Sequence, residues 1–306
     1  MKRNLFKRVK YVVYTMGLLG LFAFCSSNEQ DPGIDKPDEP DTTAVVNKII
    51  RIASYNLRLD TSNDGDKAWK YRKDMLKTVV RVNNFDIFGT QEGFLHQLND
   101  ILELKEYAYI GKGRDDGDEA GEHCAIFYKK KRFEVLDKGD FWYSETPDVP
   151  SKGWDATCCN RLCSWGKFKD KNTEEVFYVF NSHFDHQGTV ACRESARMLL
   201  AKVKQITNNY PAFCTGDFNS QPIDEPINII RTGGIVNDSR DITRKSPKGT
   251  EGTFHGYNLD GKTTSRIDYV FVTKGIQVLT YEVINDDIKY NKFASDHFPV
   301  LIEAEI

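Results

Sequence analysis

Short runs rich in valine, isoleucine, phenylalanine and tyrosine recur from residue 49 to the end of the chain, and they constrain the fold more than any other feature. Glycine, asparagine and aspartate bound these runs, and this pattern predicts β-strands. The runs cover residues 49–57, 85–91, 124–129, 162–168, 176–184, 212–218, 266–272 and 300–306. Apolar residues at helical spacing predict helices at 68–82, 94–104, 191–206 and 225–230.

The order of these elements indicates the fold class. Strands outnumber helices, and several consecutive strands have no helix between them. We therefore expect an α/β sandwich of two sheets rather than a parallel barrel. Repeats and low-complexity stretches do not interrupt residues 47–306, which we interpret as one domain.

Polar residues stand at the ends of these apolar runs. An acid, amide or imidazole at the end of a buried strand is costly unless it is paired or bound to a metal. One such residue is commonly a capping asparagine or a satisfied core histidine, but a repeated placement indicates that strand ends converge on one site. The residues are Asn56, Glu92, His183, Asp217, Asn219, Asp268, Asp296 and His297.

The chemistry of this set is that of hard oxygen donors with two imidazoles. Carboxylates and an amide carbonyl suit Mg²⁺ or Mn²⁺ better than zinc. Imidazoles and carboxylates can also move protons and orient water. Together they predict metal-assisted transfer of a phosphoryl group to water.

Six blocks carry a resemblance to a known family. SYNLR, GTQE, NSHFDHQG, TGDFNS, SRIDYVFV and SDHFPV follow one another between residues 54 and 300. In this order they resemble the endonuclease/exonuclease/phosphatase superfamily, which includes pancreatic-type deoxyribonucleases, sphingomyelinases and poly(A) deadenylases. The resemblance implies a four-layer α/β/β/α sandwich, in which two packed mixed sheets are flanked by helices.

The resemblance also implies roles for single residues. Metal binding falls to Glu92, assisted by Asn56, with Asp296 at a further metal or supporting position. The remaining five are implied as catalytic: an imidazole that contacts the phosphate, an acid that activates water, the asparagine that positions this acid, and an Asp–His pair. In that order they are His183, Asp217, Asn219, Asp268 and His297.

Two further residues are candidates for binding the substrate phosphate. In a subset of secreted bacterial members, an arginine corresponding to Arg161 faces the site, and its guanidinium suits a phosphate oxygen. A surface salt bridge is the alternative for Arg161. His255 lies in the loop before the strand of Asp268, where it either contacts the substrate or is simply solvated.

The N-terminus predicts export. Five basic residues precede an apolar run from residue 11 to Phe24, which is short for a membrane span, and then Cys25. This order resembles a bacterial lipoprotein signal, so we expect residues 1–24 to be the signal peptide, with a lipid on Cys25 anchoring the chain to the cell envelope. Phe24 departs from the small residue usual there, and an ordinary secretory signal or an uncleaved anchor is the alternative. Residues 25–46 are polar and acidic and predict a disordered tether.

The other six cysteines separate into two groups. Cys124, Cys192 and Cys214 lie in apolar or helical patterns, which favours buried free thiols. Cys158, Cys159 and Cys163 are clustered in the sequence, so one disulfide between two of them is possible.

Charge helps to rank the possible substrates. The chain has a net charge of −3, and its globular part lacks the basic excess of a protein that grips nucleic-acid phosphates. We therefore expect a monomeric, Mg²⁺- or Mn²⁺-dependent phosphodiesterase or phosphomonoesterase acting on a small or sugar-linked phosphate. A secreted nuclease is one alternative, and a catalytically silent binding lipoprotein is another. We expect contact with the membrane through the N-terminal lipid only.

Overall fold

The computed structural model describes residues 48–258, 263–285 and 293–306. These all belong to one unit, Val45–Ile306. The predicted signal peptide, Cys25 and the whole of the predicted tether lie outside the described residues. No helix among those described has the length and apolar character of a membrane span.

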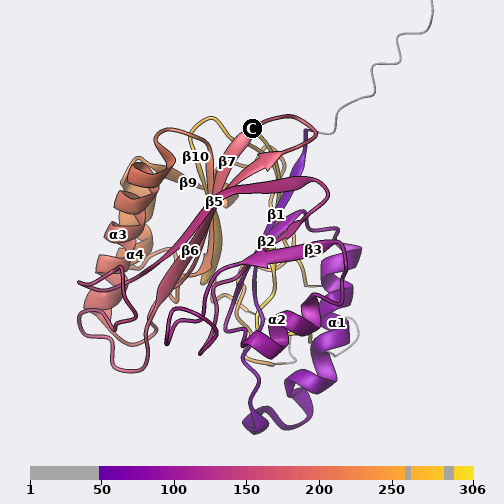
Figure 1. Ribbon diagram of the computed structural model, residues 1–306, viewed down its shortest axis with the longest axis vertical. Coiled ribbons are helices and arrows are strands. Elements are labelled where there is room, and N and C mark those ends of the chain that lie inside the picture. The colour runs from indigo at the N-terminus through magenta and orange to yellow at the C-terminus, as the bar shows by residue number, and fades with distance from the viewer. Residues whose placement is uncertain (1–47, 259–262, 286–292) are drawn as a thin grey trace, which may run out of the picture. The chain divides into compact units, whose positions relative to one another are not determined.

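Two six-stranded mixed sheets form the centre of the fold (Figure 1). The first sheet has the order β11-β12-β1-β2-β4-β3 and the second β5-β6-β7-β8-β10-β9. The strands of the first sheet are β1 (Ile50–Asn56), β2 (Ile87–Gln91), β3 (Tyr107–Ile110), β4 (Ile126–Lys129), β11 (Gln277–Val283) and β12 (Val300–Glu305). Those of the second are β5 (Phe133–Trp142), β6 (Leu162–Asp170), β7 (Val176–His183), β8 (Ala212–Asp217), β9 (Val236–Asp238) and β10 (Asp268–Thr273).

Helices cover the outer face of each sheet, because their apolar stripes pack on residues that alternate away from the central core. The first sheet carries α1 (Trp69–Val82) and α2 (Leu95–Ile101), preceded by the 3₁₀ helix η1 (Ser62–Lys67). The second carries α3 (Thr189–Thr207) and α4 (Glu225–Thr232), and α5 (Ser239–Ile242) is a single turn after β9. The α/β/β/α sandwich is thereby confirmed (Figure 1).

The core between the sheets is built from aliphatic and aromatic side chains of both. Ile52 and Ile302 of the first sheet lie in one cluster with Phe177, Phe213 and Val270 of the second. Burial of this kind of surface contributes about 25 cal/mol per Å², which makes it the main source of stability. The packed sheets form a rigid support for the loops at their ends.

The basic run at residues 129–132 joins β4 of the first sheet to β5 of the second. It is therefore a crossing between sheets. Arg132 pairs there with Asp86 at 3.0 Å and with Asp170 at 2.7 Å, so one guanidinium links the two sheets at this end.

Candidate active site

The first sheet brings its polar residues to one end through strand direction. β1 and β2 are parallel, and Asn56 at the end of β1 lies opposite Gln91, the residue before Glu92. β12 runs antiparallel to β1, so Asp296 and His297, which precede it, return to the same end.

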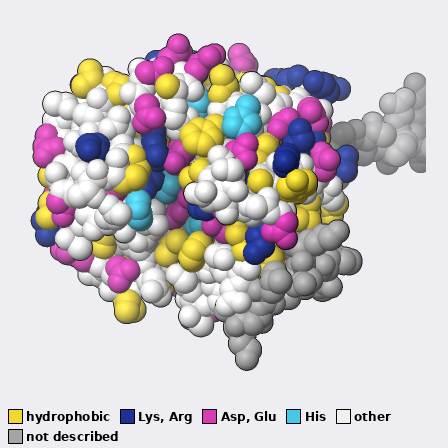
Figure 2. Space-filling model, turned by 90° about the horizontal axis from the view of Figure 1, so that it is seen from below, with side chains coloured by type: hydrophobic (Ala, Val, Ile, Leu, Met, Phe, Trp, Pro, Cys, Tyr) yellow, Lys and Arg dark blue, Asp and Glu magenta, His cyan; other side chains and the backbone are white. Residues whose placement is uncertain are grey.

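The second sheet does the same with a parallel pair and an antiparallel neighbour. His183 and Asp217 end β7 and β8 and lie opposite one another in register. Asp268 begins the antiparallel β10 opposite Asp217. Figure 2 views this end of the molecule and shows histidine, acidic and basic side chains gathered around a hollow.

Asn56 connects the two sheets at the site. Its Nδ2 donates to Oε1 of Glu92 at 3.0 Å and to Oδ2 of Asp217 at 2.9 Å, while its Oδ1 accepts the backbone N–H of Arg58 at 2.9 Å. Glu92 has a left-handed backbone (φ 64°), and its Oε2 accepts the N–H of Leu59 at 3.1 Å. Asn56 therefore holds two carboxylates together and turns its NH₂ group, rather than the carbonyl expected of a metal ligand, toward them.

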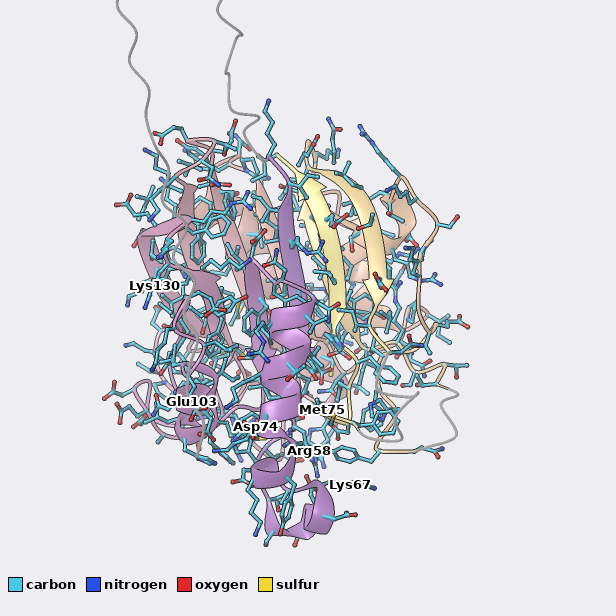
Figure 3. The ribbon with its side chains drawn as sticks, turned by 90° about the vertical axis from the view of Figure 1, so that its right-hand side faces the viewer. Arg58, Lys67, Asp74, Met75, Glu103 and Lys130 are labelled. Atoms are coloured by element: carbon cyan, nitrogen blue, oxygen red, sulfur yellow. The ribbon has the colours of Figure 1, made fainter. Side chains whose placement is uncertain are left out.

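Arg58 closes the site on the side of η1. It pairs with Asp64 of η1 at 2.9 Å and lies 3.8 Å from Oδ2 of Asp296. Its position near η1 and the start of α1 is visible in Figure 3. The guanidinium partly offsets the charge of a buried carboxylate.

A candidate metal centre lies between the sheets. One ligand atom each of Glu92, Asp217 and His297 come within 4.8 Å of one another. Burial, with Asp268 nearby, raises the pKa of Asp217 to about 7. Burial likewise raises the pKa of the Asp296 carboxyl. Because so many acidic oxygens are costly to bury without a cation, this donor set fits a divalent metal. Of the three expected ligands, Glu92 lies in this cluster.

His297 and Asp268 form a buried pair. Nδ1 of His297 lies 2.8 Å from Oδ2 of Asp268, and the Asp268 N–H donates to Thr253 Oγ1 at 3.1 Å. Although burial disfavours a charged ring, Asp268 and other carboxylates raise the pKa of His297 well above its usual value. The ring is thus held charged, with Nε2 3.8 Å from Oδ2 of Asp217. A charged imidazole has no free nitrogen to bind a metal, so the carboxylates are the candidate ligands and His297 is a hydrogen-bond donor beside them.

His183 has the opposite character. Burial, with Arg161 and Arg114 nearby, lowers its pKa well below the usual value, so the ring is neutral. Its Nε2 lies 3.8 Å from Asp217 Oδ2, and its Nδ1 lies 3.7 Å from Oε2 of Glu122. Glu122 pairs with Arg114 at 2.6 Å. The sequence did not single out Glu122 and Arg114, although an acid two residues before the apolar run at 124–129 was an available signal.

Asn219 positions Asp217. Its backbone N–H donates to Asp217 Oδ1 at 2.9 Å, and its Nδ2 donates to the carbonyl of Phe184 at 3.0 Å. The left-handed φ of 47° places both groups, and asparagine tolerates this conformation better than most residues.

Arg161 is buried beside the acids rather than paired at the surface. Its side chain is 6% exposed, Nη2 donates to Nδ1 of His186 at 2.8 Å, and Nε lies 3.6 Å from Asp185 Oδ1. Within the part of the chain that the structure describes, Nε and Nη1 have no hydrogen-bond partner. A buried guanidinium with unused donors is suited to an anion.

His255 lies apart from these residues. Its ring packs between Phe293 and Phe298 at centroid distances of 4.4 and 4.3 Å, and its Nδ1 accepts the N–H of Tyr257 at 3.2 Å. Burial lowers its pKa to about 3. It is absent from the described lining of the cavity, where its neighbour Phe254 stands instead, so its placement argues against the expected phosphate contact.

The cavity at these strand ends has a volume of about 370 Å³. It is lined by acids, arginines, histidines, two cysteines and a few apolar residues. They are Arg58, Leu59, Glu92, Arg114, Glu122, Cys158, Cys159, Arg161, His183, His186, Asp217, Asn219, Phe254, Ile267, Asp296 and His297.

All six described cysteines are free, so the disulfide left open by the sequence does not form. Cys163 is buried in β6, whereas Cys158 and Cys159 line the cavity. Cys124, Cys192 and Cys214 are buried thiols, as expected.

The site matches a known family. The model of the Endonuclease/Exonuclease/phosphatase family matches residues 53–297, which include every acid and imidazole described above. The chain belongs to this family. Endonuclease/exonuclease/phosphatase proteins hydrolyse phosphoric esters and depend on a divalent metal.

Several endonuclease/exonuclease/phosphatase proteins are similar over most of the chain. A family member from Bacteroides thetaiotaomicron is 43% identical with a TM-score of 0.79, over 84% of this chain and 97% of that one. A mannosyl-6-phosphatase of the same organism is 41% identical with a TM-score of 0.79, over 84% and 100%. The 3'-5'-exoribonuclease subunit of the CCR4-Not complex of Emericella nidulans is 23% identical over 87% of this chain, but the match spans 53% of that longer protein.

Proposed function

We propose that this chain is a Mg²⁺- or Mn²⁺-dependent phosphomonoesterase that removes phosphate from sugars by in-line attack of water. One observation carries the proposal. The unpartnered nitrogens of the buried Arg161 and the cluster of Glu92, Asp217 and His297 belong to residues lining one cavity of about 370 Å³. Such a cavity suits a ligand of the size of a hexose phosphate.

The residues divide the chemistry between them. Asp217 accepts the proton of the attacking water, and Asn219 holds the Asp217 carboxylate in orientation. Burial raises the pKa of this carboxyl, which favours proton uptake. The charged His297 donates to the phosphoryl group, while Asp268 accepts from Nδ1 and orients the ring.

Other residues that line the cavity stabilise the negative charge of the phosphoryl group. The neutral His183 and the Arg161 guanidinium donate to the equatorial oxygens. Glu92, with Asp217 and Asp296 nearby, would hold the divalent cation, which supplies Lewis-acid stabilisation of the leaving oxygen. Asn56 holds the Glu92 and Asp217 carboxylates close together by donating a hydrogen bond to each.

The substrate class is supported by similarity and by charge. The 41% identical mannosyl-6-phosphatase favours a sugar-linked monoester. The chain is acidic overall, whereas a nuclease would gain from a basic surface. Nuclease activity is the second candidate, because the exoribonuclease subunit described above is a relative.

We further propose that the enzyme acts outside the cytoplasm, tethered through a lipid on Cys25. The support is the order of basic, apolar and cysteine residues in the leader. Incorporation of labelled palmitate that is lost in Cys25→Ser is the expected result. Equal labelling of both proteins would contradict it.

The proposed activity is tested with the purified protein and α-methyl mannoside 6-phosphate, bis-p-nitrophenyl phosphate and single-stranded RNA. We expect EDTA-sensitive phosphate release from the mannoside. Asp217→Asn and His297→Ala should each lose at least about 100-fold in kcat, the usual scale of acid–base catalysis, without a loss of circular dichroism. Faster cleavage of RNA would establish the nuclease, and full activity of both variants would refute the assigned roles.

A further inference from the structure

Two segments far apart in the sequence are joined to form one wall of the cavity. Asp155, in the loop before β6, accepts the backbone N–H groups of Val190 at 3.1 Å and Ala191 at 2.7 Å in the first turn of α3. Thr157 of the same loop donates to the side chain of Gln187. These bonds fix the loop against the segment that follows β7.

Within this wall His186 is held although it is exposed. Arg161 Nη2 donates to its Nδ1 at 2.8 Å. The preceding residue, Asp185, is buried and accepts the N–H groups of Gln187 at 3.0 Å and Gly188 at 2.6 Å. Arg161 also lies 3.6 Å from Asp185, so both the ring and the backbone that carries it are anchored.

The bond to Arg161 determines which nitrogen of His186 carries a proton. A guanidinium has only donors, so Nδ1 must be the bare acceptor. The proton of the neutral ring is therefore on Nε2. His186 thus offers a neutral N–H donor at the cavity, beside the cationic group that we assign to phosphate.

We propose that His186 is a specificity-determining residue, whose Nε2–H donates to a hydroxyl oxygen of the sugar ring that carries the phosphate. This inference rests on the proposed phosphomonoesterase function. Arg161 and His183 already donate to the phosphate in the proposed function, and the neutral N–H of His186 matches an uncharged hydroxyl. Because His186 is exposed, an analogue that lacks the hydroxyl should lose the energy of one neutral hydrogen bond.

The test compares the full-length wild type with His186→Phe and His186→Gln. Phenylalanine keeps a ring but has no donor, whereas glutamine can accept from Arg161 and still donate. The substrates are α-methyl mannoside 6-phosphate, its 2-, 3- and 4-deoxy analogues, and p-nitrophenyl phosphate, which has no ring hydroxyl. His96→Phe is the matched control, since His96 is also exposed and pairs with Asp60 away from the cavity lining.

We expect His186→Phe to lower kcat/KM for the mannoside about 3- to 10-fold more than for p-nitrophenyl phosphate, the scale of one neutral hydrogen bond. A loss shared by both substrates measures the lost bond to Arg161. With the wild type, one deoxy analogue should have a kcat/KM lower than that of the mannoside by the same factor. With His186→Phe, this analogue and the mannoside should have equal kcat/KM. His186→Gln should restore most of the difference.

Equal losses on both substrates would mean that His186 acts only through Arg161, and this would overturn the inference. No loss on either substrate would overturn it as well. Hydrolysis of p-nitrophenyl phosphate but of no sugar phosphate would refute the hydroxyl contact while leaving the esterase activity intact. If the wild type releases phosphate from neither ester, the proposed function fails and the inference falls with it.

Discussion

Replacing Asn181 with alanine should destabilise the fold by removing a polar bridge between the two sheets. Asn181 is fully buried in β7 and makes four hydrogen bonds. Its Oδ1 accepts from Gln91 Nε2 at 2.7 Å and Thr215 Oγ1 at 3.0 Å. Its Nδ2 donates to the carbonyls of Thr90 at 2.8 Å and Ala125 at 3.0 Å.

The expected cost follows from these partners. Four neutral hydrogen bonds contribute roughly 2–6 kcal/mol together. Three partners keep a second bond: Gln91 to Ser54, Thr215 to the Phe180 carbonyl, and the Ala125 carbonyl from the Thr90 N–H. We therefore expect a loss of about 2–4 kcal/mol, or roughly 5–15 °C in the melting temperature.

Urea unfolding followed by circular dichroism measures this loss. Asn172→Ala is the control, because Asn172 is exposed and the substitution should change the free energy of unfolding by less than about 0.5 kcal/mol. Thr215→Val should be non-additive with Asn181→Ala, since the two side chains share a hydrogen bond. If Asn181→Ala costs no more than Asn172→Ala, the polar bridge does not stabilise the fold and the reasoning is wrong.

Three further predictions concern the site. Asp268→Asn removes a carboxylate that raises the pKa of His297, so the alkaline limb of the kcat/KM–pH profile should move to lower pH; an unmoved limb would exclude His297 as the group that titrates. Mg²⁺ at about 100 times its Kd should raise the free energy of unfolding of the wild type by about 2.7 kcal/mol, measured by thermal unfolding. Glu92→Gln should lose most of this stabilisation, and an equal stabilisation of the variant would place the metal elsewhere. A maleimide should label the exposed Cys158 before Cys159, because burial raises the pKa of the Cys159 thiol to about 11. Labelling should inhibit hydrolysis, since Cys158 lines the cavity. Mass spectrometry of tryptic peptides identifies the labelled cysteine, and full activity of the labelled protein would contradict the prediction.

The difference between strands that the sequence predicted and strands that it missed has a physical cause. All eight predicted runs form strands, and the four missed strands, β3, β5, β9 and β11, are the edges of the two sheets. An edge strand has one neighbour and tolerates charged residues, which weakens its apolar pattern. β5, for example, contains Glu134, Asp137 and Lys138, all exposed.

The same distinction applies to the site. Residues at the ends of central strands were predictable, because strand direction alone brings Asn56, His183 and Asp217 together. The orientation of the Asn56 amide, the packing of His255 between phenylalanines and the bond from Arg161 to His186 depend on loops. Loop conformation is set by tertiary contacts and has no periodic pattern in the sequence.

Because the site is assembled from both sheets, its geometry depends on how the sheets pack. Asn56 of the first sheet donates to Asp217 of the second at 2.9 Å, so a small shift between the sheets changes the spacing of the acids. Close approach is enforced at Gly89 of β2, where an added Cβ would lie 2.3 Å from Oδ1 of Asn181 and 2.2 Å from Oγ1 of Thr215. Catalysis should therefore be sensitive to the polar bridge at Asn181, and Asn181→Ala should lower kcat even at temperatures where the protein stays folded.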